Sequence, residues 1–124
     1  MKIIFDTNFL MLPFTHRVDV FDEAARVCPE KAEFFVLRAS LGELANVKGS
    51  DRMAAKAAVA YLERNSNGVE FVDGSGKPDA QILGFVKANA GCVVATSDAD
   101  LKRKVRAAGG RVLTLRSLTH LELE

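Results

Sequence analysis

Short apolar runs recur along this chain, each separated from the next by a longer segment with helical spacing. The runs are KIIF (2–5), FFVL (34–37), VEFV (69–72), CVVAT (92–96) and RVLTL (111–115). Their β-branched and aromatic content, over about four to eight residues each, is typical of buried β-strands. The pattern therefore predicts strands at regular intervals along most of the chain.

The segments between these runs predict helices. They cover residues 20–27, from Ser40 to the break at 48–51, about 51–65, 78 to about 89, and 97–108. Pro29 ends the first of them and Gly109-Gly110 the last. Strands that alternate with helices indicate a parallel sheet covered on both faces. We therefore predict one α/β domain over residues 1–124, with three layers, a central parallel sheet of four or five strands, and a short irregular C-terminal tail at 117–124.

Composition adds the class of protein. Of the 124 residues, 48% are hydrophobic and 27% are charged, which is typical of one globular domain. The net charge of +1 provides no global field toward nucleic acid or membranes, so any such attraction must be local. Cys28 and Cys92 have no spaced partner and predict buried, reduced thiols.

No part of the chain predicts membrane insertion. No apolar run approaches the roughly 20 residues that span a bilayer. The start MKIIFDTN is interrupted by an acid, which excludes a secretory signal there. We expect a cytoplasmic protein without membrane contact.

Four acids follow the predicted strands: Asp6, Glu43, Asp79 and Asp98. In an open parallel sheet, ligands bind outside the carboxyl ends of the strands, so these acids are expected to meet at one edge. Clustered carboxylates repel one another, and a divalent cation removes that penalty. Ligands that are oxygen alone suit Mg²⁺ or Mn²⁺. The pattern favours a metal site and phosphodiester chemistry.

Each acid also has a local explanation, which stays open from sequence alone. Asp6 can cap the following helix. Glu43 stands three residues after Ser40, and that spacing favours a capping box. All four acids are predicted at one end of the sheet, and this shared position makes a metal site about as well supported as the four separate local explanations.

The acids near the last two helices show the same ambiguity. Asp98 and Asp100 fall in a predicted first helical turn, where the helix dipole stabilises acids. Yet Asp98 is spaced with Leu101 and Val105 on the apolar face, which predicts an inward-pointing carboxylate. Asp79 likewise begins an apolar stripe, and acids are rarely buried unpaired, so it should lie at a cleft edge or on a cation.

Four pieces of sequence together resemble the PIN domain family. They are FDTN at 5–8, Glu43-Leu44, Asp79 with Ile82-Leu83, and TSDADL at 96–101. The resemblance runs through essentially the whole chain. It implies a compact α/β fold with a parallel sheet and an Mg²⁺- or Mn²⁺-dependent ribonuclease.

The resemblance also implies roles for individual residues. The acidic cluster would be Asp6, Glu43, Asp79 and Asp98, with Asp100 as a further metal ligand. Supporting polar positions would be Thr7, Asn8, Thr96 and Ser97, the last standing where relatives often carry Asn. Hydrolysis would leave a 5′-phosphate and a 3′-hydroxyl.

Two branches of the family look close: VapC-like toxin ribonucleases and archaeal proteins similar to PIN nucleases of ribosomal RNA processing. Candidate partners are RNA, an antitoxin, a ribosome-assembly protein and a second copy of the chain. The stretch 8–14 has more apolar residues than one helix face needs, which suggests a contact with a second copy of the chain or with an antitoxin. The alternative function is a non-catalytic PIN-fold module that binds RNA or an assembly partner. A DNA-directed or flap nuclease fits less well.

Basic residues cluster after Asp98 and Asp100. Between Leu101 and Ser117 there are six of them and no acid. We expect RNA-phosphate contacts from Lys102, Arg103, Lys104 and Arg106, because such contacts give sequence-independent affinity. A solvated helix face is the alternative. Gly74-Ser75-Gly76-Lys77 lacks the full phosphate-loop pattern, since Pro78 replaces its Ser or Thr, and predicts a flexible loop near the site.

Overall fold

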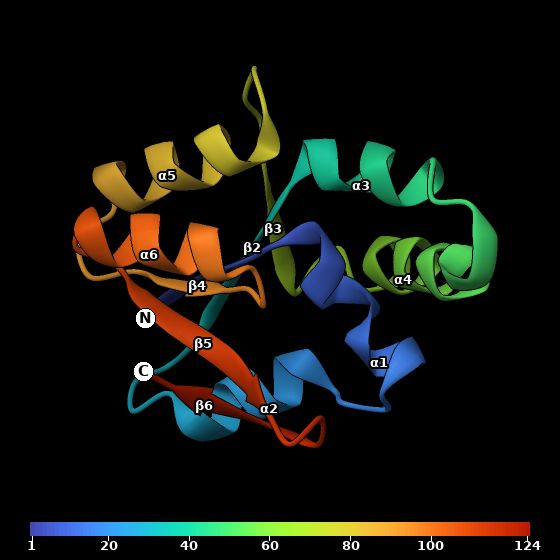
Figure 1. Ribbon diagram of the computed structural model, residues 1–124, viewed down its shortest axis with the longest axis horizontal. Helices are drawn as coiled ribbons and strands as arrows, with labels where there is room; N and C mark the ends of the chain where they lie inside the picture. The colour runs from blue at the N-terminus through green and yellow to red at the C-terminus, as the bar shows by residue number, and fades with distance from the viewer.

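A six-stranded sheet forms the centre of the molecule in the computed structural model, which describes residues 1–124 (Figure 1). The strand order is β3-β2-β1-β4-β5-β6. The strands are β1 (Lys2–Phe5), β2 (Glu33–Leu37), β3 (Val69–Val72), β4 (Val93–Ala95), β5 (Arg111–Arg116) and β6 (His120–Leu123). The first five are parallel, and β6 pairs antiparallel with β5. The predicted α/β class and parallel sheet are confirmed.

Helices cover both faces of this sheet. They are α1 (Leu12–Thr15), α2 (Val20–Val27), α3 (Arg38–Ala45), α4 (Arg52–Arg64), α5 (Pro78–Ala88) and α6 (Ala99–Ala107), with two 3-10 turns, η1 (Thr7–Met11) and η2 (Gly49–Asp51). In Figure 1, α5 and α6 lie together on one side of the sheet and α2 on the other. None of the helices has the length and apolar character needed to cross a membrane.

The core has two parts because successive residues of a strand point to opposite faces. On β1, Ile4 packs in the cluster that includes Ile82 of α5 and Leu101 of α6. Its neighbours Ile3 and Phe5 pack in the larger cluster with α2, α4 and η1. Cys28 and Cys92 are buried free thiols, as predicted, one in each part.

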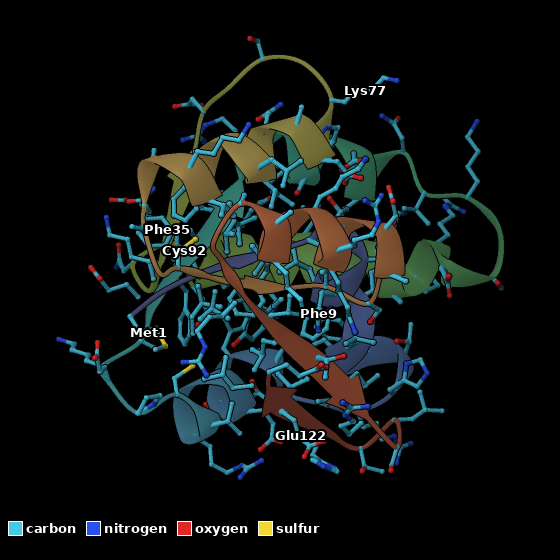
Figure 2. All side chains as sticks on the ribbon, turned by 60° about the vertical axis from the view of Figure 1, so that its left-hand side comes forward. Met1, Phe9, Phe35, Lys77, Cys92 and Glu122 are labelled. Atoms are coloured by element: carbon cyan, nitrogen blue, oxygen red, sulfur yellow. The ribbon has the colours of Figure 1, made fainter.

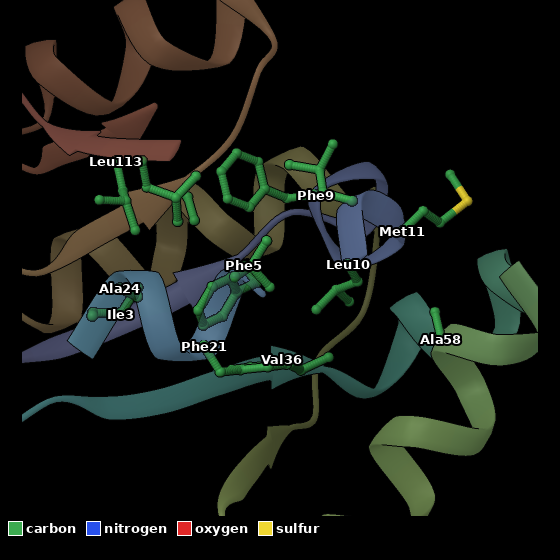
Figure 3. Packing of buried hydrophobic residues seen from close by; sticks show 14 of the residues in the cluster. Ile3, Phe5, Phe9, Leu10, Met11, Phe21, Ala24, Val36, Ala58 and Leu113 are labelled. Carbon is green, nitrogen blue, oxygen red and sulfur yellow. The ribbon is translucent and has the colours of Figure 1, made fainter. Parts of the chain in front are cut away.

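The apolar stretch after β1 belongs to the core. Phe9, Leu10, Met11 and Leu12 are all buried, and only Phe14 is 40% exposed. Figure 3 shows Phe9 and Leu10 close to Phe5 on the buried face of the sheet. The prediction that residues 8–14 form a contact surface is therefore wrong for most of the stretch. These side chains fill the space between the sheet and α4.

The predicted irregular tail is also wrong, because it contains β6. The chain reverses at Ser117 and Leu118, which have φ angles of 53° and 57°, and returns along β5. Leu121 on β6 is fully buried. The reversal uses left-handed backbone without Gly or Asn, so it lacks the usual sequence signal of a hairpin.

Candidate active site

A polar cleft of about 300 Å³ lies at the carboxyl ends of the central strands. It has no hydrophobic lining residue; its walls are Asp6, Thr7, Asn8, Glu43, Lys77, Pro78, Asp79 and Asp98. The four acids come from four separate segments, after β1, in α3, in α5 and before α6. The convergence expected from the strand ends is therefore present in the fold.

A larger hollow of about 370 Å³ lies beside the opposite ends of the strands. Its acids, Glu30 and Glu33, stand with the Met1 amine and Lys2, and Glu30 forms a salt bridge to that amine. Its size is greater, but its charges are balanced internally. The polar cleft is the better candidate because its acids have no such partners.

Asp6 lies directly after β1, where its N–H donates to the Ala95 carbonyl at 2.9 Å. One carboxylate oxygen accepts the Thr7 N–H at 2.8 Å and the other accepts the Thr96 hydroxyl at 2.9 Å. Burial raises the pKa of Asp6 above its ordinary value; the bonds from Thr96 and Thr7 oppose that rise, and the charges of Asp79 and Glu43 add to it. Its ionised form is thus destabilised, a penalty that a bound cation would remove.

Glu43 extends from α3 into the cleft, where its carboxylate is held by the Thr7 hydroxyl, which also contacts the Ser40 hydroxyl. The Thr7 hydroxyl donates to Glu43 Oε1 at 2.5 Å and lies 2.8 Å from the Ser40 hydroxyl. Ser40 is fully buried. The capping box predicted for Ser40 and Glu43 is wrong: α3 begins at Arg38 with Leu37 as its N-cap, so Ser40 already lies inside the helix. Its hydroxyl bonds to the chain after β1 instead of capping the helix.

Asp98 and Thr96 join the site from the β4–α6 connection. The Thr96 hydroxyl donates to Asp6 and accepts the Asp98 N–H at 3.1 Å, so it links the two acids. Asp98 is the N-cap of α6, and its Oδ1 accepts the Leu101 N–H at 3.0 Å. The predicted inward-pointing Asp98 is wrong, because a residue before the first turn does not share the helical stripe. It is exposed, as is Asp79, at the mouth of the cleft.

Asp100 stands apart from the other acids. It does not line the cleft, and its carboxylate pairs with Arg103 and, at 3.0 Å, with Lys104 on the same helix. These cations hold the pKa of Asp100 below its ordinary value. The i, i+3 and i, i+4 spacings favour these partners over the cleft.

The supporting positions divide in the same way. Thr7 and Thr96 are buried and bond to the acids, and Asn8 is exposed in the cleft wall. Ser97 is exposed and is not part of the lining. The sequence analysis did not place Ser40 or Lys77 in the site; Lys77 lines the cleft, and the buried Ser40 hydroxyl bonds to Thr7 behind the cleft wall. Their signal was proximity, since Ser40 stands one helical turn from Glu43 and Lys77 two residues before Asp79.

The predicted basic track is largely paired within the chain. Arg103 and Lys104 bond to Asp100, and Arg106 bonds to Glu124 at 2.9 Å. Lys102 donates to the Thr114 hydroxyl. The six basic residues between Leu101 and Ser117 therefore do not provide six free charges, although no acid lies among them in the sequence.

The donor set fits a hard divalent cation, although the side chains are not yet in a coordinating arrangement. No group of three or more His, Cys, Asp or Glu side chains is placed to hold a metal ion. The cleft nevertheless offers four carboxylates and has no His or Cys in its lining, and such a set of oxygen ligands suits Mg²⁺ or Mn²⁺. Burial raises the pKa of Asp6 and the charges of Asp79 and Glu43 add to that rise, so a bound cation would also stabilise the ionised form of this acid.

Comparisons with known proteins agree with this geometry. Residues 3–118 match a family described as "PIN like domain", a span that includes all four cleft acids. The chain is 30% identical over 128 residues to "Ribonuclease VapC4" of Methanocaldococcus jannaschii, covering 98% of this chain and 95% of that protein. The solved structure "Structure of the PIN domain endonuclease Utp24" matches with a TM-score of 0.81 at 20% identity, over 99% of this chain and 90% of that one. At that identity the structural match shows the fold.

Proposed function

Because the chain belongs to the family of PIN-like domains, we propose that it is a metal-dependent endoribonuclease that hydrolyses RNA phosphodiester bonds. The observation that carries the proposal is the cleft itself, where the carboxylates of Asp6, Glu43, Asp79 and Asp98 meet. The relative that is 30% identical is named a ribonuclease, and the match covers nearly the whole of both chains.

The acids would hold Mg²⁺ or Mn²⁺. A bound ion of this kind supplies a water of lowered pKa and stabilises charge on the phosphate oxygens. Asp6 and Asp98 are the proposed direct ligands, and Glu43 and Asp79 bind the ion directly or through water, since Mg²⁺ keeps several waters and few carboxylates. Asp100 has no part in this set, because its own cations occupy it.

Hydroxyl groups orient these acids. Thr96 bridges Asp6 and the Asp98 backbone, and Thr7 holds Glu43. The carboxylates of Asp6, Glu43 and Asp98 each accept a hydrogen bond, which orients them and leaves further lone pairs for a cation. Partners of this type commonly change metal affinity or activity by about 10- to 100-fold when they are removed.

RNA contact by α6 is the weaker part of the proposal. Lys102, Arg103, Lys104 and Arg106 remain candidates, but each already has a partner within the chain. Exposed ion pairs are weak, at about 0–1 kcal/mol, so a phosphate can replace a carboxylate partner at low cost. The contacts should weaken steeply as salt is added.

For the role in the cell we propose ribosomal RNA processing or the toxin function of a toxin–antitoxin pair, in the cytoplasm. An antitoxin, a ribosome-assembly protein or a second copy of the chain is the corresponding partner. A small reading frame beside this one, whose product binds the purified chain and inhibits it, would decide for the toxin.

The test is cleavage of an end-labelled RNA with Mg²⁺ or Mn²⁺ and with a chelator. We expect cutting only with metal, and products that carry a 5′-phosphate and a 3′-hydroxyl. RNA that is bound but never cut at any metal concentration would favour the non-catalytic binding module instead.

A further inference from the structure

One cation lines the acidic cleft, and it is Lys77. None of the eight salt bridges in the molecule involves it, so its ammonium has no carboxylate within 4.0 Å. On α6, Arg103, Lys104 and Arg106 are each paired with a carboxylate, and Lys102 donates to the Thr114 hydroxyl. The charge of Lys77 is therefore available to an anion that enters the cleft.

The position of Lys77 is set by bonds at both ends of its loop. At one end Asp73 pairs with Arg38 at 2.6 Å. At the other end the Gln81 side-chain amide donates to the Gly76 carbonyl at 2.9 Å, and the Gln81 N–H donates to the Lys77 carbonyl at 3.1 Å. Figure 2 shows Lys77 where this loop returns to α5. The loop predicted to be flexible is thus tied to the helix that carries Asp79.

The glycines of the loop permit this close packing. A Cβ on Gly74 would lie 2.7 Å from Gln81 Oε1, and Gly76 has a φ angle of 90°. Gln81 Oε1 is buried without a hydrogen-bond partner, so packing of the loop over Gln81 is maintained at some cost. The Gly74-Ser75-Gly76-Lys77 segment is therefore held against α5, and this packing places Lys77 at the cleft. The segment does not form a phosphate-binding loop.

Electrostatics indicate what Lys77 binds. The acids of the cleft repel the phosphates of RNA, and a bound metal offsets that repulsion only at the phosphate it touches. Asp6 is half-buried in the cleft, whereas Lys77 is exposed. We infer that Lys77 contacts the backbone phosphate next to the cleaved bond. This inference rests on the proposed function, and it adds a substrate contact that the acids do not supply.

The test compares Lys77→Ala and Lys77→Arg with the unmodified chain, using a short labelled single-stranded RNA at several KCl concentrations and saturating metal. A lost phosphate contact should raise KM about tenfold and leave kcat unchanged. The slope of log KM against log salt should fall by about 0.7, the value for one contact on a single strand. Lys77→Arg keeps the charge and should retain both values. Lys31→Ala is the matched control, because Lys31 is exposed before β2, at the other edge of the sheet, and should change nothing.

A change in kcat without a change in KM or salt slope would overturn the inference, because it would mean that Lys77 acts on the acids. Unchanged kinetics in Lys77→Ala would also overturn it. RNA binding, measured by fluorescence anisotropy in an Asp6→Asn background, separates the two proposals. If the unmodified chain binds RNA but never cuts it, the enzyme proposal fails, and the salt slope of binding still decides the role of Lys77. If it neither binds nor cuts, both fail.

Discussion

Asp6 has the least favourable surroundings of the cleft acids for a negative charge. Its carboxylate is partly buried, and the nearby charges of Asp79 and Glu43 reinforce the rise in its pKa. Two hydrogen bonds, from Thr7 and Thr96, oppose this and fix its orientation. A residue that is costly to the fold but held in a definite orientation is typical of a functional site.

Asp6→Asn should therefore reduce cleavage activity by at least about 100-fold. The same substitution should stabilise the metal-free fold at neutral pH. The pKa of Asp6 is raised above 3.8 in the folded state, so the fold binds this proton more tightly than the unfolded chain does. Stability then falls as pH rises through the raised pKa, and the variant escapes that loss. Thermal melts in a chelator from acid to neutral pH should show the variant gaining on the unmodified chain. A variant that is less stable at neutral pH would contradict this account.

Thr7→Val should weaken both the fold and the site. The substitution removes the donor to Glu43 and leaves the Ser40 hydroxyl buried without that partner. Such an unpaired group costs about 1–3 kcal/mol of unfolding free energy. Denaturant titration measures that loss, and cleavage assays should show about 10- to 100-fold lower activity. Thr15→Val is the control, since Thr15 is exposed and bonds only to Met11 and His16 nearby. Equal losses in both variants would rule out a special role for Thr7.

For individual residues, the sequence predicted which acids lie together in the cleft, but it did not predict the hydrogen-bond partners of those acids. Position after a strand was enough to place Asp6 and Asp98 at the same cleft, since parallel strands end at one edge. The bond from Thr7 to Glu43 joins residues 36 positions apart, so the nearer Ser40 was a misleading partner for Glu43. Asp100 was misplaced because its helical neighbours Arg103 and Lys104 were counted as RNA contacts and not as its partners.

Among the elements, β6 has the largest consequence for the fold. It covers the edge of β5, which a shorter chain would leave exposed to pairing with other molecules. Arg116 on β5 pairs across to Glu122 at 2.9 Å and to Glu124 at 3.3 Å. The strand was missed because HLEL is short and charged and follows a reversal without Gly. The five parallel strands were predicted well, since each contains a run of apolar residues of which at least part is buried in the sheet.

Leu121→Ala tests whether β6 belongs to the core. Leu121 is fully buried among the side chains of the larger core cluster, so its truncation should cost about 2–5 kcal/mol of unfolding free energy. Leu118→Ala removes the same atoms from a side chain that is 60% exposed, and should change stability by less than about 0.5 kcal/mol. Denaturant titration of both variants gives the comparison. Similar values for the two would mean that 117–124 behaves as a tail in solution.

In the molecule as a whole, the site lies at the point in the sheet where the direction in which successive strands are added reverses. β1 lies between β2 and β4, so the chain runs outward from β1 toward β3 on one side and toward β6 on the other. A crevice at such a switch point is the usual ligand site of an open parallel sheet. Phe5 pairs with Ala95 in the register of β1 and β4, which brings Asp6 and Thr96 together although 90 residues separate them. The two acids nearest this junction, Asp6 and Asp98, are therefore the proposed metal ligands.

Titration with Mn²⁺, followed by the loss of the free-ion signal in electron paramagnetic resonance, tests the metal site without any RNA. We predict that the unmodified chain binds Mn²⁺, that Asp6→Asn binds it at least about 100-fold more weakly, and that Asp100→Asn binds it like the unmodified chain because Asp100 is paired outside the cleft. Equal Mn²⁺ affinity in the unmodified chain and Asp6→Asn would contradict the claim that the cleft acids hold the ion.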